Sequence, residues 1–115
     1  MARKTHPKRL TQKWEFQRGY QKGKKYWNRC FVMYVVWNSL NQTRLGITAT
    51  KKLGGSVKRN RIKRLIRESF RLSKHQIRQG YDIIVVGRSE AIDMKCQQAQ
   101  SSLLQLLRQA HVLKT

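Results

Sequence analysis

The side chains best suited to chemistry in this sequence are the cations gathered between Lys51 and Arg71. This stretch holds nine of the chain's 26 lysine and arginine residues, and Glu68 is its single acid. The nine cations are Lys51, Lys52, Lys58, Arg59, Arg61, Lys63, Arg64, Arg67 and Arg71. Ammonium and guanidinium groups bind phosphate oxygens through charge-assisted hydrogen bonds, and a guanidinium can donate two such bonds in parallel. The stretch is therefore predicted to bind a polyanion.

The same stretch has the period of a helix that packs on one side. At about 100° per residue, one arc holds the apolar side chains and the opposite arc the cations. The apolar arc consists of Ile62, Leu65, Ile66, Ser69 and Phe70. The opposite arc consists of Asn60, Arg64, Arg67 and Arg71, with Lys63 at its edge. A solvated helix usually mixes charges of both signs, so we interpret the nearly unopposed basic arc as a nucleic-acid surface.

The whole chain is small and strongly basic. Its 115 residues include 26 basic and five acidic side chains, which gives a formal charge of +21. This charge indicates RNA, DNA or an anionic membrane surface as the partner. The membrane is the weakest of the three, because the longest apolar stretch, Cys30–Trp37, is no longer than a strand. The N-terminus lacks the apolar segment of a secretory signal. Residues 81–115 are nearly balanced in charge and are predicted to be scaffold.

Aromatic side chains form a second candidate site. Phe16 and Tyr20 lie one turn apart in a predicted helix, and Tyr34 lies in a predicted strand whose two faces are both mostly apolar. Such residues can pack in a core, or they can serve as platforms on which unpaired bases stack. The pattern leaves both interpretations open.

Thiol and metal chemistry find little support in the sequence. Cys30 and Cys96 form no CxxC pair and the three histidines are scattered, which argues against a zinc site. Reduced thiols of this kind are typical of a cytoplasmic protein. Hydrolysis of RNA by protein-bound metal ions needs clustered carboxylates, and no two of the five acids share a motif. Catalysis by the protein alone is therefore not expected, and any Mg²⁺ held by the protein would be weakly bound and shared with RNA phosphates.

The elements that must position these residues can be read along the chain. We expect a mobile basic arm over residues 1–9, two helices N-capped by Thr11 and Ser56, and a short connection that favours an antiparallel pair of strands. The expected helices are Leu10–Tyr20, the basic helix after Ser56, and Met94–Leu113; the expected strands are Lys24–Asn28, Arg29–Trp37, Arg44–Thr50 and a central Tyr81–Val86. This α-β-β-β-α-β-α order predicts one α+β domain over residues 1–115, a two-layer α/β sandwich with a small mixed sheet.

The sequence resembles the bacterial ribonuclease P protein subunit. The resemblance is carried by Arg59-Asn60-Arg61 followed by the basic amphipathic helix. It extends to Leu10, Phe16, Tyr20 and Gly23, to Phe31-Val32-Met33-Tyr34, to Arg44-Leu45-Gly46-Ile47 with Lys51-Lys52-Leu53-Gly54, and to Tyr81–Val86. It implies a fold like the second domain of a small-subunit ribosomal protein, with a left-handed β-α-β crossover.

The resemblance also implies a division of labour. A catalytic RNA removes the 5′ leader from precursor tRNA with bound Mg²⁺, and the protein binds that RNA and the single-stranded leader without supplying catalytic or metal-binding residues. The residues implied for the RNA subunit are Lys58, Arg59, Asn60, Arg61, Lys63, Arg64, Arg67 and Arg71. Those implied for the leader are Phe16, Tyr20, Tyr34, Lys13, Arg29 and Lys51. Neither DNA nor a membrane is an expected partner. The alternative function is that of a structural RNA-binding protein, such as a ribosomal protein.

Overall fold

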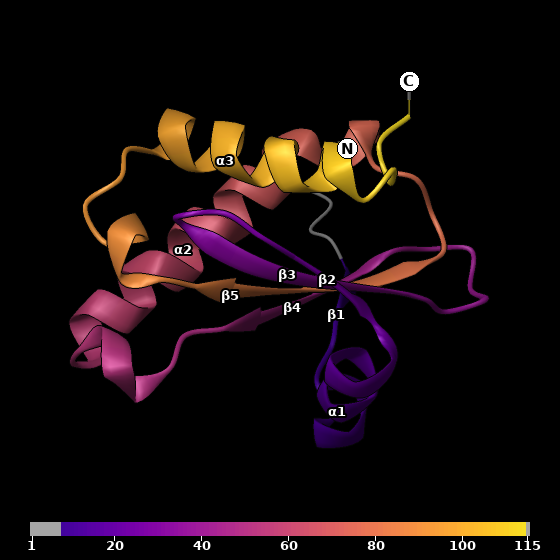
Figure 1. Cartoon of the computed structure of the whole chain (residues 1–115), viewed down its shortest axis with the longest axis horizontal. Coiled ribbons are helices and arrows are strands. Elements are labelled where there is room, and N and C mark those ends of the chain that lie inside the picture. The colour runs from indigo at the N-terminus through magenta and orange to yellow at the C-terminus, as the bar shows by residue number, and fades with distance from the viewer. Residues whose placement is uncertain (1–7, 115) are drawn as a thin grey trace, which may run out of the picture.

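Figure 1 shows the computed structural model of the chain, which describes residues 8–114. Its strands are β1 (Lys8–Arg9), β2 (Lys24–Trp27), β3 (Phe31–Trp37), β4 (Arg44–Thr48) and β5 (Tyr81–Gly87). Its α-helices are α1 (Lys13–Lys22), α2 (Ser56–Ser73) and α3 (Cys96–Gln109), and its single-turn 3₁₀ helices are η1 (Lys51–Leu53), η2 (Lys74–Gln76) and η3 (Ser89–Ala91). Apart from the short strand β1 and the 3₁₀ turns, the order is the predicted α-β-β-β-α-β-α.

The five strands form one mixed sheet in the order β1-β4-β5-β3-β2. β5 lies at the centre, parallel to β4 and antiparallel to β3, as its apolar sequence predicted. The expected antiparallel pairing of β3 with β4 is wrong, because β5 lies between them. Residues 82–85 of β5 are all buried, and a strand that is apolar on both faces gains most from a central position. The later strand therefore displaces the local hairpin.

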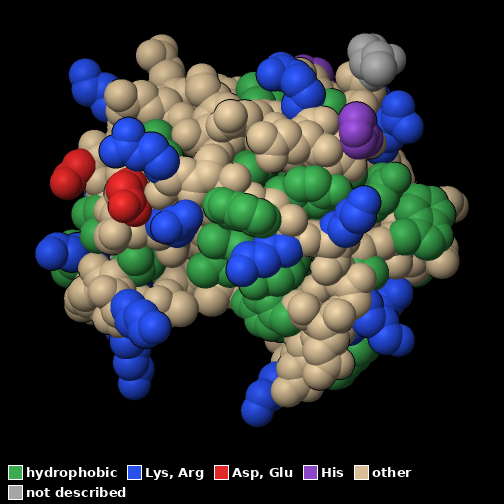
Figure 2. Space-filling view, viewed as in Figure 1, with side chains coloured by type: hydrophobic (Ala, Val, Ile, Leu, Met, Phe, Trp, Pro, Cys, Tyr) green, Lys and Arg blue, Asp and Glu red, His purple; other side chains and the backbone are tan. Residues whose placement is uncertain are grey.

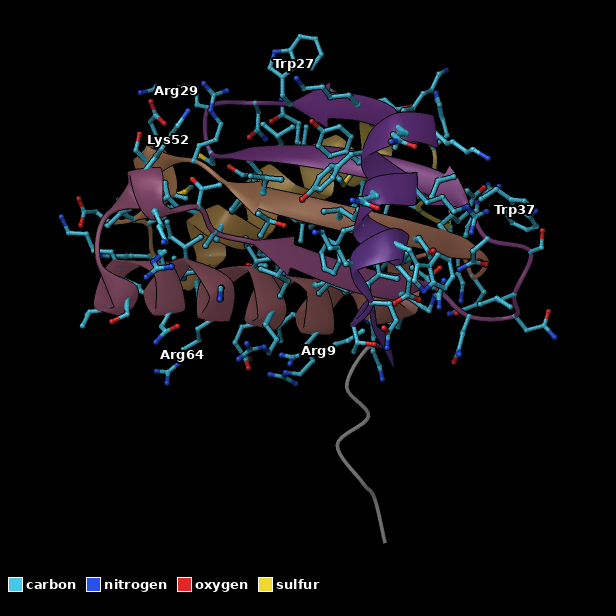
Figure 3. The ribbon with its side chains drawn as sticks, turned by 90° about the horizontal axis from the view of Figure 1, so that it is seen from below. Arg9, Trp27, Arg29, Trp37, Lys52 and Arg64 are labelled. Carbon is cyan, nitrogen blue, oxygen red and sulfur yellow. The ribbon has the colours of Figure 1, made fainter. Side chains whose placement is uncertain are left out.

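Helices cover both faces of this sheet. α2 and α3 form the predicted second layer on one face, and α1 lies on the opposite face (Figure 1). The chain runs from β4 through α2 into its parallel neighbour β5. Figure 3 views the sheet from the α1 side, where β5 lies to the right of β4 when both strands point up. From the α2 side the order is reversed, so the crossover through α2 is left-handed. Most parallel crossovers have the other hand, and this exception agrees with the family resemblance.

The main core lies between the sheet and the α2–α3 layer. α2 contributes Ile62, Ile66 and Phe70, which are almost completely buried. They pack with apolar side chains of the sheet and α3, namely Phe31, Met33, Leu45, Ile83, Val85, Ala99, Leu103, Leu106 and Leu107. Burial of a large apolar side chain contributes about 1.5–3 kcal/mol, so three such residues fix the rotation of α2. The predicted apolar arc is confirmed, and the opposite arc consequently faces outward.

The two predicted N-caps are wrong by one residue each. α1 begins after Gln12, and the backbone N–H groups of Thr11 and Gln12 both donate to Oε1 of Glu15, at 3.0 and 2.8 Å. The glutamate therefore satisfies the donors that a threonine cap would have left free. α2 has Gly55 as its N-cap, and Ser56 is its first helical residue.

The last two residues of the predicted mobile arm over residues 1–9 are in fact part of the sheet. Lys8 and Arg9 form β1 and pair in parallel with Arg44 and Leu45 of β4. Leu10 explains this, because its side chain is buried and its N–H donates to the carbonyl oxygen of Leu45 at 2.9 Å. Residues 1–7 of the arm lie outside the described residues.

Candidate nucleic-acid interface

The position of α1 over the sheet is set by a buried ionic network. Arg44 of β4 donates from Nη1 to Oε2 of Glu15 at 2.6 Å, and from Nε and Nη2 to the two carboxylate oxygens of Asp82 at 2.8 and 2.7 Å. Asn38 donates to Asp82 at 2.9 Å. The hydrogen bonds to Asp82 are the main cause that raises the pKa of Arg44. The network joins α1, β4 and β5, so it places the aromatic residues of α1.

Glu15 is the acidic end of this network. Its side chain is 6% exposed, and hydrogen bonds from the backbone N–H groups of Gln12 and Thr11, together with the charge of Arg44, lower its pKa against the effect of burial. The hydrogen bond from Gln12 is the largest of these causes. The carboxylate therefore remains ionised and holds the first turn of α1 against β4.

The predicted aromatic set meets where α1 crosses the sheet. The rings of Tyr20 and Tyr34 are 4.9 Å apart and nearly perpendicular, at 82°. The Tyr20 hydroxyl lies 2.8 Å from Oγ1 of Thr48. Phe16 packs over Gly46, where an added Cβ would come within 2.7 Å of the ring. These rings pack against other residues, as core residues would. They also keep exposed surface on which a base could stack, because Phe16 and Tyr34 are half-buried and Tyr20 is 39% exposed.

Strand register shows which part of this face α1 leaves open. Residues paired across the sheet place Lys25, Tyr34, Ile84 and Gly46 in one row, and α1 packs on this row through Phe16 and Gly19. The next row consists of Trp27, Val32, Val86 and Thr48. The members of this second row are half-buried or, for Trp27, exposed. A partly apolar strip thus runs beside the Tyr20–Tyr34 pair.

The basic arc of α2 faces away from the sheet, as predicted. Asn60 and Arg64 are exposed, and Figure 3 shows Arg64 directed outward from the helix. Lys58 was expected in an irregular turn, but it lies in the regular first turn of α2 with its side chain against Gly54. Asn60 and Arg64 of the arc are thus free to contact a partner from one helical face.

Arg61 has a different role from its neighbours. Its Nε and Nη2 donate to the backbone carbonyl oxygens of Ile92 and Met94, at 2.5 and 3.3 Å. These bonds tie α2 to the segment that precedes α3. Arg59 is half-buried, and its Nε is buried without a hydrogen-bond partner among the described residues.

Arg67 lies in a groove between α2 and α1. The groove has a volume of about 200 Å³ and is lined by Arg9, Leu10, Phe16, Leu45, Ile47, Lys63 and Arg67. Burial, together with the nearby charges of Arg9 and Arg64, lowers the pKa of Arg67. Its Nε is buried and has no partner within residues 8–114. The groove therefore concentrates positive charge beside Phe16 and would be stabilised by a phosphate.

The remaining predicted cations do not form one cluster. They are Arg71 and the three residues predicted to bind the leader, Lys13, Arg29 and Lys51. Arg71 forms an ion pair of 2.8 Å with Glu68, whose hydrogen bond is the main cause that raises the pKa of the guanidinium. Lys13, Arg29 and Lys51 are all exposed, but they lie in the first turn of α1, the β2–β3 connection and η1, respectively. In Figure 3, Arg29 and Lys52 are both at one end of the sheet.

Sequence reasoning missed several members of this surface. The Glu15–Arg44–Asp82 network joins residues 29 and 38 positions apart, and the only local signal was an acid within the apolar strand Tyr81–Gly87. Arg9 was assigned to the arm and not to a groove. Trp27 and Arg88 were not selected, because neither belongs to a periodic pattern.

Within residues 8–114, no helix is long and apolar enough to cross a membrane. In the same residues, no three His, Cys, Asp or Glu side chains are grouped as metal ligands.

Comparison with known proteins gives a consistent result. Residues 5–111 match the family model described as Ribonuclease P. The chain is 37% identical over 107 residues to the ribonuclease P protein component of Alkaliphilus oremlandii, a match that covers 93% of this chain and 94% of that one. These matches confirm the ribonuclease P family predicted from the sequence and lend no support to the ribosomal alternative.

Solved structures agree with the sequence matches. The Staphylococcus aureus RNase P protein superposes with a TM-score of 0.83 at 45% identity, covering 92% of this chain and 97% of that chain. The Thermotoga maritima RNase P protein gives 0.81 at 32% identity, covering 89% and 96%. A second staphylococcal structure is of a mutant described as having defective mRNA degradation activity; it gives 0.83 at 46% identity, covering 90% and 88%.

Proposed function

This chain belongs to the family of ribonuclease P protein components, and from that premise we propose that it binds the catalytic RNA and the precursor tRNA leader on adjoining surfaces. The role of an RNA-binding subunit in tRNA processing follows from the family. The proposal concerns which surface meets which RNA. The outward arc of α2 contacts the RNA subunit, and the face beside Tyr20 and Tyr34 holds the single-stranded leader.

The observation that carries this proposal is the groove between α1 and α2. Phe16 lines it from α1, and Lys63 and Arg67 line it from α2. An RNA strand that stacks on the aromatic face would thus have its phosphates beside the cations of the helix. Stacking accepts every base, which suits a substrate whose leader sequence varies from one tRNA to the next.

We further propose that hydrolysis belongs to the RNA subunit. Two of the five acids, Glu15 and Asp82, are buried and share the guanidinium of Arg44, so their charges are partly compensated by a cation that is part of the fold. This donor set does not fit a protein Mg²⁺ site of clustered, uncompensated carboxylates. Mg²⁺ is then held mainly by RNA, and we expect the protein to act in the cytoplasm.

Reconstitution tests the division of labour. The pure protein, a bacterial ribonuclease P RNA and a 5′-extended precursor tRNA would be mixed at low Mg²⁺ concentration, with each component also tested alone. We expect only the mixture to release a single 5′ leader efficiently. Release by the protein alone would contradict the assignment of hydrolysis to RNA. Binding of RNA without any rescue of cleavage would contradict the role as a ribonuclease P subunit.

A further inference from the structure

An exposed tryptophan stands at the end of the open row of the sheet. Trp27 is the last residue of β2, and its side chain is 61% exposed. It pairs with Val32 of β3, and Lys25 pairs with Tyr34. Side chains two residues apart on a strand share a face, so Trp27 lies on the same face as the Tyr20–Tyr34 pair, one row further along the sheet.

A shallow groove accompanies this tryptophan. It has a volume of about 400 Å³ and is lined by Lys25, Trp27, Val32 and Arg88. Its floor and wall are apolar, and both of its charged groups are cations. Figure 2 shows the edge of the molecule on which hydrophobic side chains are exposed between lysine and arginine side chains.

Arg88 is held in place beside this groove. Its Nη1 donates to the carbonyl oxygen of Asn28 at 2.9 Å, and its backbone N–H donates to the carbonyl oxygen of Cys30 at 2.9 Å. Its other guanidinium N–H groups have no hydrogen-bond partner in residues 8–114. Glu90 interacts electrostatically with Arg88 and with Arg29. It is exposed, so an incoming phosphate can compete with it.

We propose that Lys25, Trp27, Val32 and Arg88 form a further nucleotide subsite, in which an unpaired leader base stacks on Trp27 while Arg88 and Lys25 bind its phosphate. This inference rests on the proposed function, because it extends the leader-binding face beyond the Tyr20–Tyr34 pair. An apolar ring beside two cations matches the two chemical parts of a nucleotide. The continuity of the row from Thr48 to Trp27 favours the strand already bound at the tyrosines over a separate protein partner.

The subsite predicts a preference at one leader position. The indole is the largest ring on this face, and stacking strength grows with the area of the base, so purines gain more from it than pyrimidines. Modest preferences of this kind arise from stacking and not from hydrogen bonds to base edges. We therefore expect one leader position at which a purine binds about tenfold more tightly than an abasic site, which corresponds to ~1.4 kcal/mol.

A double-mutant cycle tests the subsite directly. The affinity of the reconstituted holoenzyme would be measured for precursor tRNAs that carry a purine or an abasic residue at each leader position in turn. Trp27→Ala should remove the purine preference at one position and leave the abasic substrate unchanged. Trp27→Phe should retain part of that preference, because the aromatic face remains. Trp37→Ala is the matched control, since Trp37 is similarly exposed but lies at the other end of β3 (Figure 3).

The possible outcomes separate this inference from the function on which it rests. Leader-dependent affinity that Trp27→Ala leaves unchanged, or lowers equally for purine and abasic substrates, would overturn the subsite while the leader-binding face stands. Wild-type affinity that is independent of the leader would overturn the proposed leader-binding function, and the subsite with it. Arg88→Gln should weaken binding of every base and reduce the dependence of log affinity on log salt by about 1. An unchanged salt dependence would remove Arg88 from the subsite.

Discussion

Glu15 and Arg44 are joined by a 2.6 Å ion pair, although one lies in α1 and the other in β4. The same guanidinium binds both carboxylate oxygens of Asp82 in the central strand. Removal of the Glu15 charge weakens the acceptor of the Arg44 Nη1 hydrogen bond at a largely buried site, which costs more than an exposed pair is worth. The helix that carries Phe16 and Tyr20 is therefore fixed to the sheet through a charge, as well as through apolar contact.

The first prediction concerns the stability of that attachment. Glu15→Gln retains a carbonyl oxygen for the N–H groups of Thr11 and Gln12 but removes the charge that faces Arg44. We expect the free energy of unfolding to fall by about 1–3 kcal/mol, measured by urea denaturation. Glu90→Gln is the control, because Glu90 is exposed and should change stability little. Equal stability of the wild type and Glu15→Gln would show that the ion pair does not hold α1.

The second prediction is the pH dependence of the same interaction. Because the pKa of Glu15 is lower in the folded protein than its ordinary value of 4.5, its contribution is fully present above that value and is lost as the pH falls through the folded pKa. The difference in unfolding free energy between the wild type and Glu15→Gln should thus be constant near neutrality and shrink in acid below about pH 4.5. A difference that grows on acidification would contradict the assigned direction.

The third prediction concerns the basic arc of α2. Arg64→Ala with Arg67→Ala should weaken binding to the ribonuclease P RNA and reduce the slope of log affinity against log salt by about 2. The fold should survive, because the apolar side chains of α2 point the other way. Arg108→Gln, at an exposed position of α3, should have little effect. Unchanged affinity of the double variant at moderate salt would refute the assignment of α2 to the RNA subunit.

The fourth prediction concerns the aromatic face. Phe16→Ala and Tyr34→Ala should lower affinity for precursor tRNAs with long leaders, by ~1–3 kcal/mol for each stacked base lost. Affinity for mature tRNA should change little, because it has no leader to stack. The measurement is a series of substrates that differ only in leader length. Equal losses for mature and precursor tRNA would mean that both rings act only in packing.

Local periodicity predicted the parts of this structure that depend on local sequence. The helical period places Ile62, Ile66 and Phe70 on one side of α2 and Arg64 on the other, whatever the rest of the chain does. The resemblance carried by Arg59-Asn60-Arg61 then indicated the family. The apolar strand Tyr81–Val86 was also expected at the centre, because no edge position would bury both of its faces.

Contacts between residues far apart in the sequence could not be predicted from local patterns. Two strands joined by a short connection are usually neighbours, and nothing within Phe31–Thr48 reveals that residues from 81 onward will separate them. From the sequence, Arg44 could have faced solvent or RNA. Its ion pairs with Glu15 and Asp82 form only because α1, β4 and β5 come together in the fold. Trp27 carried no signal as a strand residue, and only the pairing register places it on the same face as Tyr34, one row further along the sheet.

The central position of β5 constrains when the sheet can form during synthesis of the chain. The strands that flank it are both synthesised first, yet they hydrogen-bond to β5 and not to each other. Until Tyr81–Gly87 has left the ribosome, the earlier strands β3 and β4 lack their shared partner, and the face proposed to bind the leader cannot assemble. Contacts between residues so far apart in sequence slow folding. The complete sheet, and with it the surface beside Tyr20 and Tyr34, therefore forms only after the basic helix α2 has been synthesised.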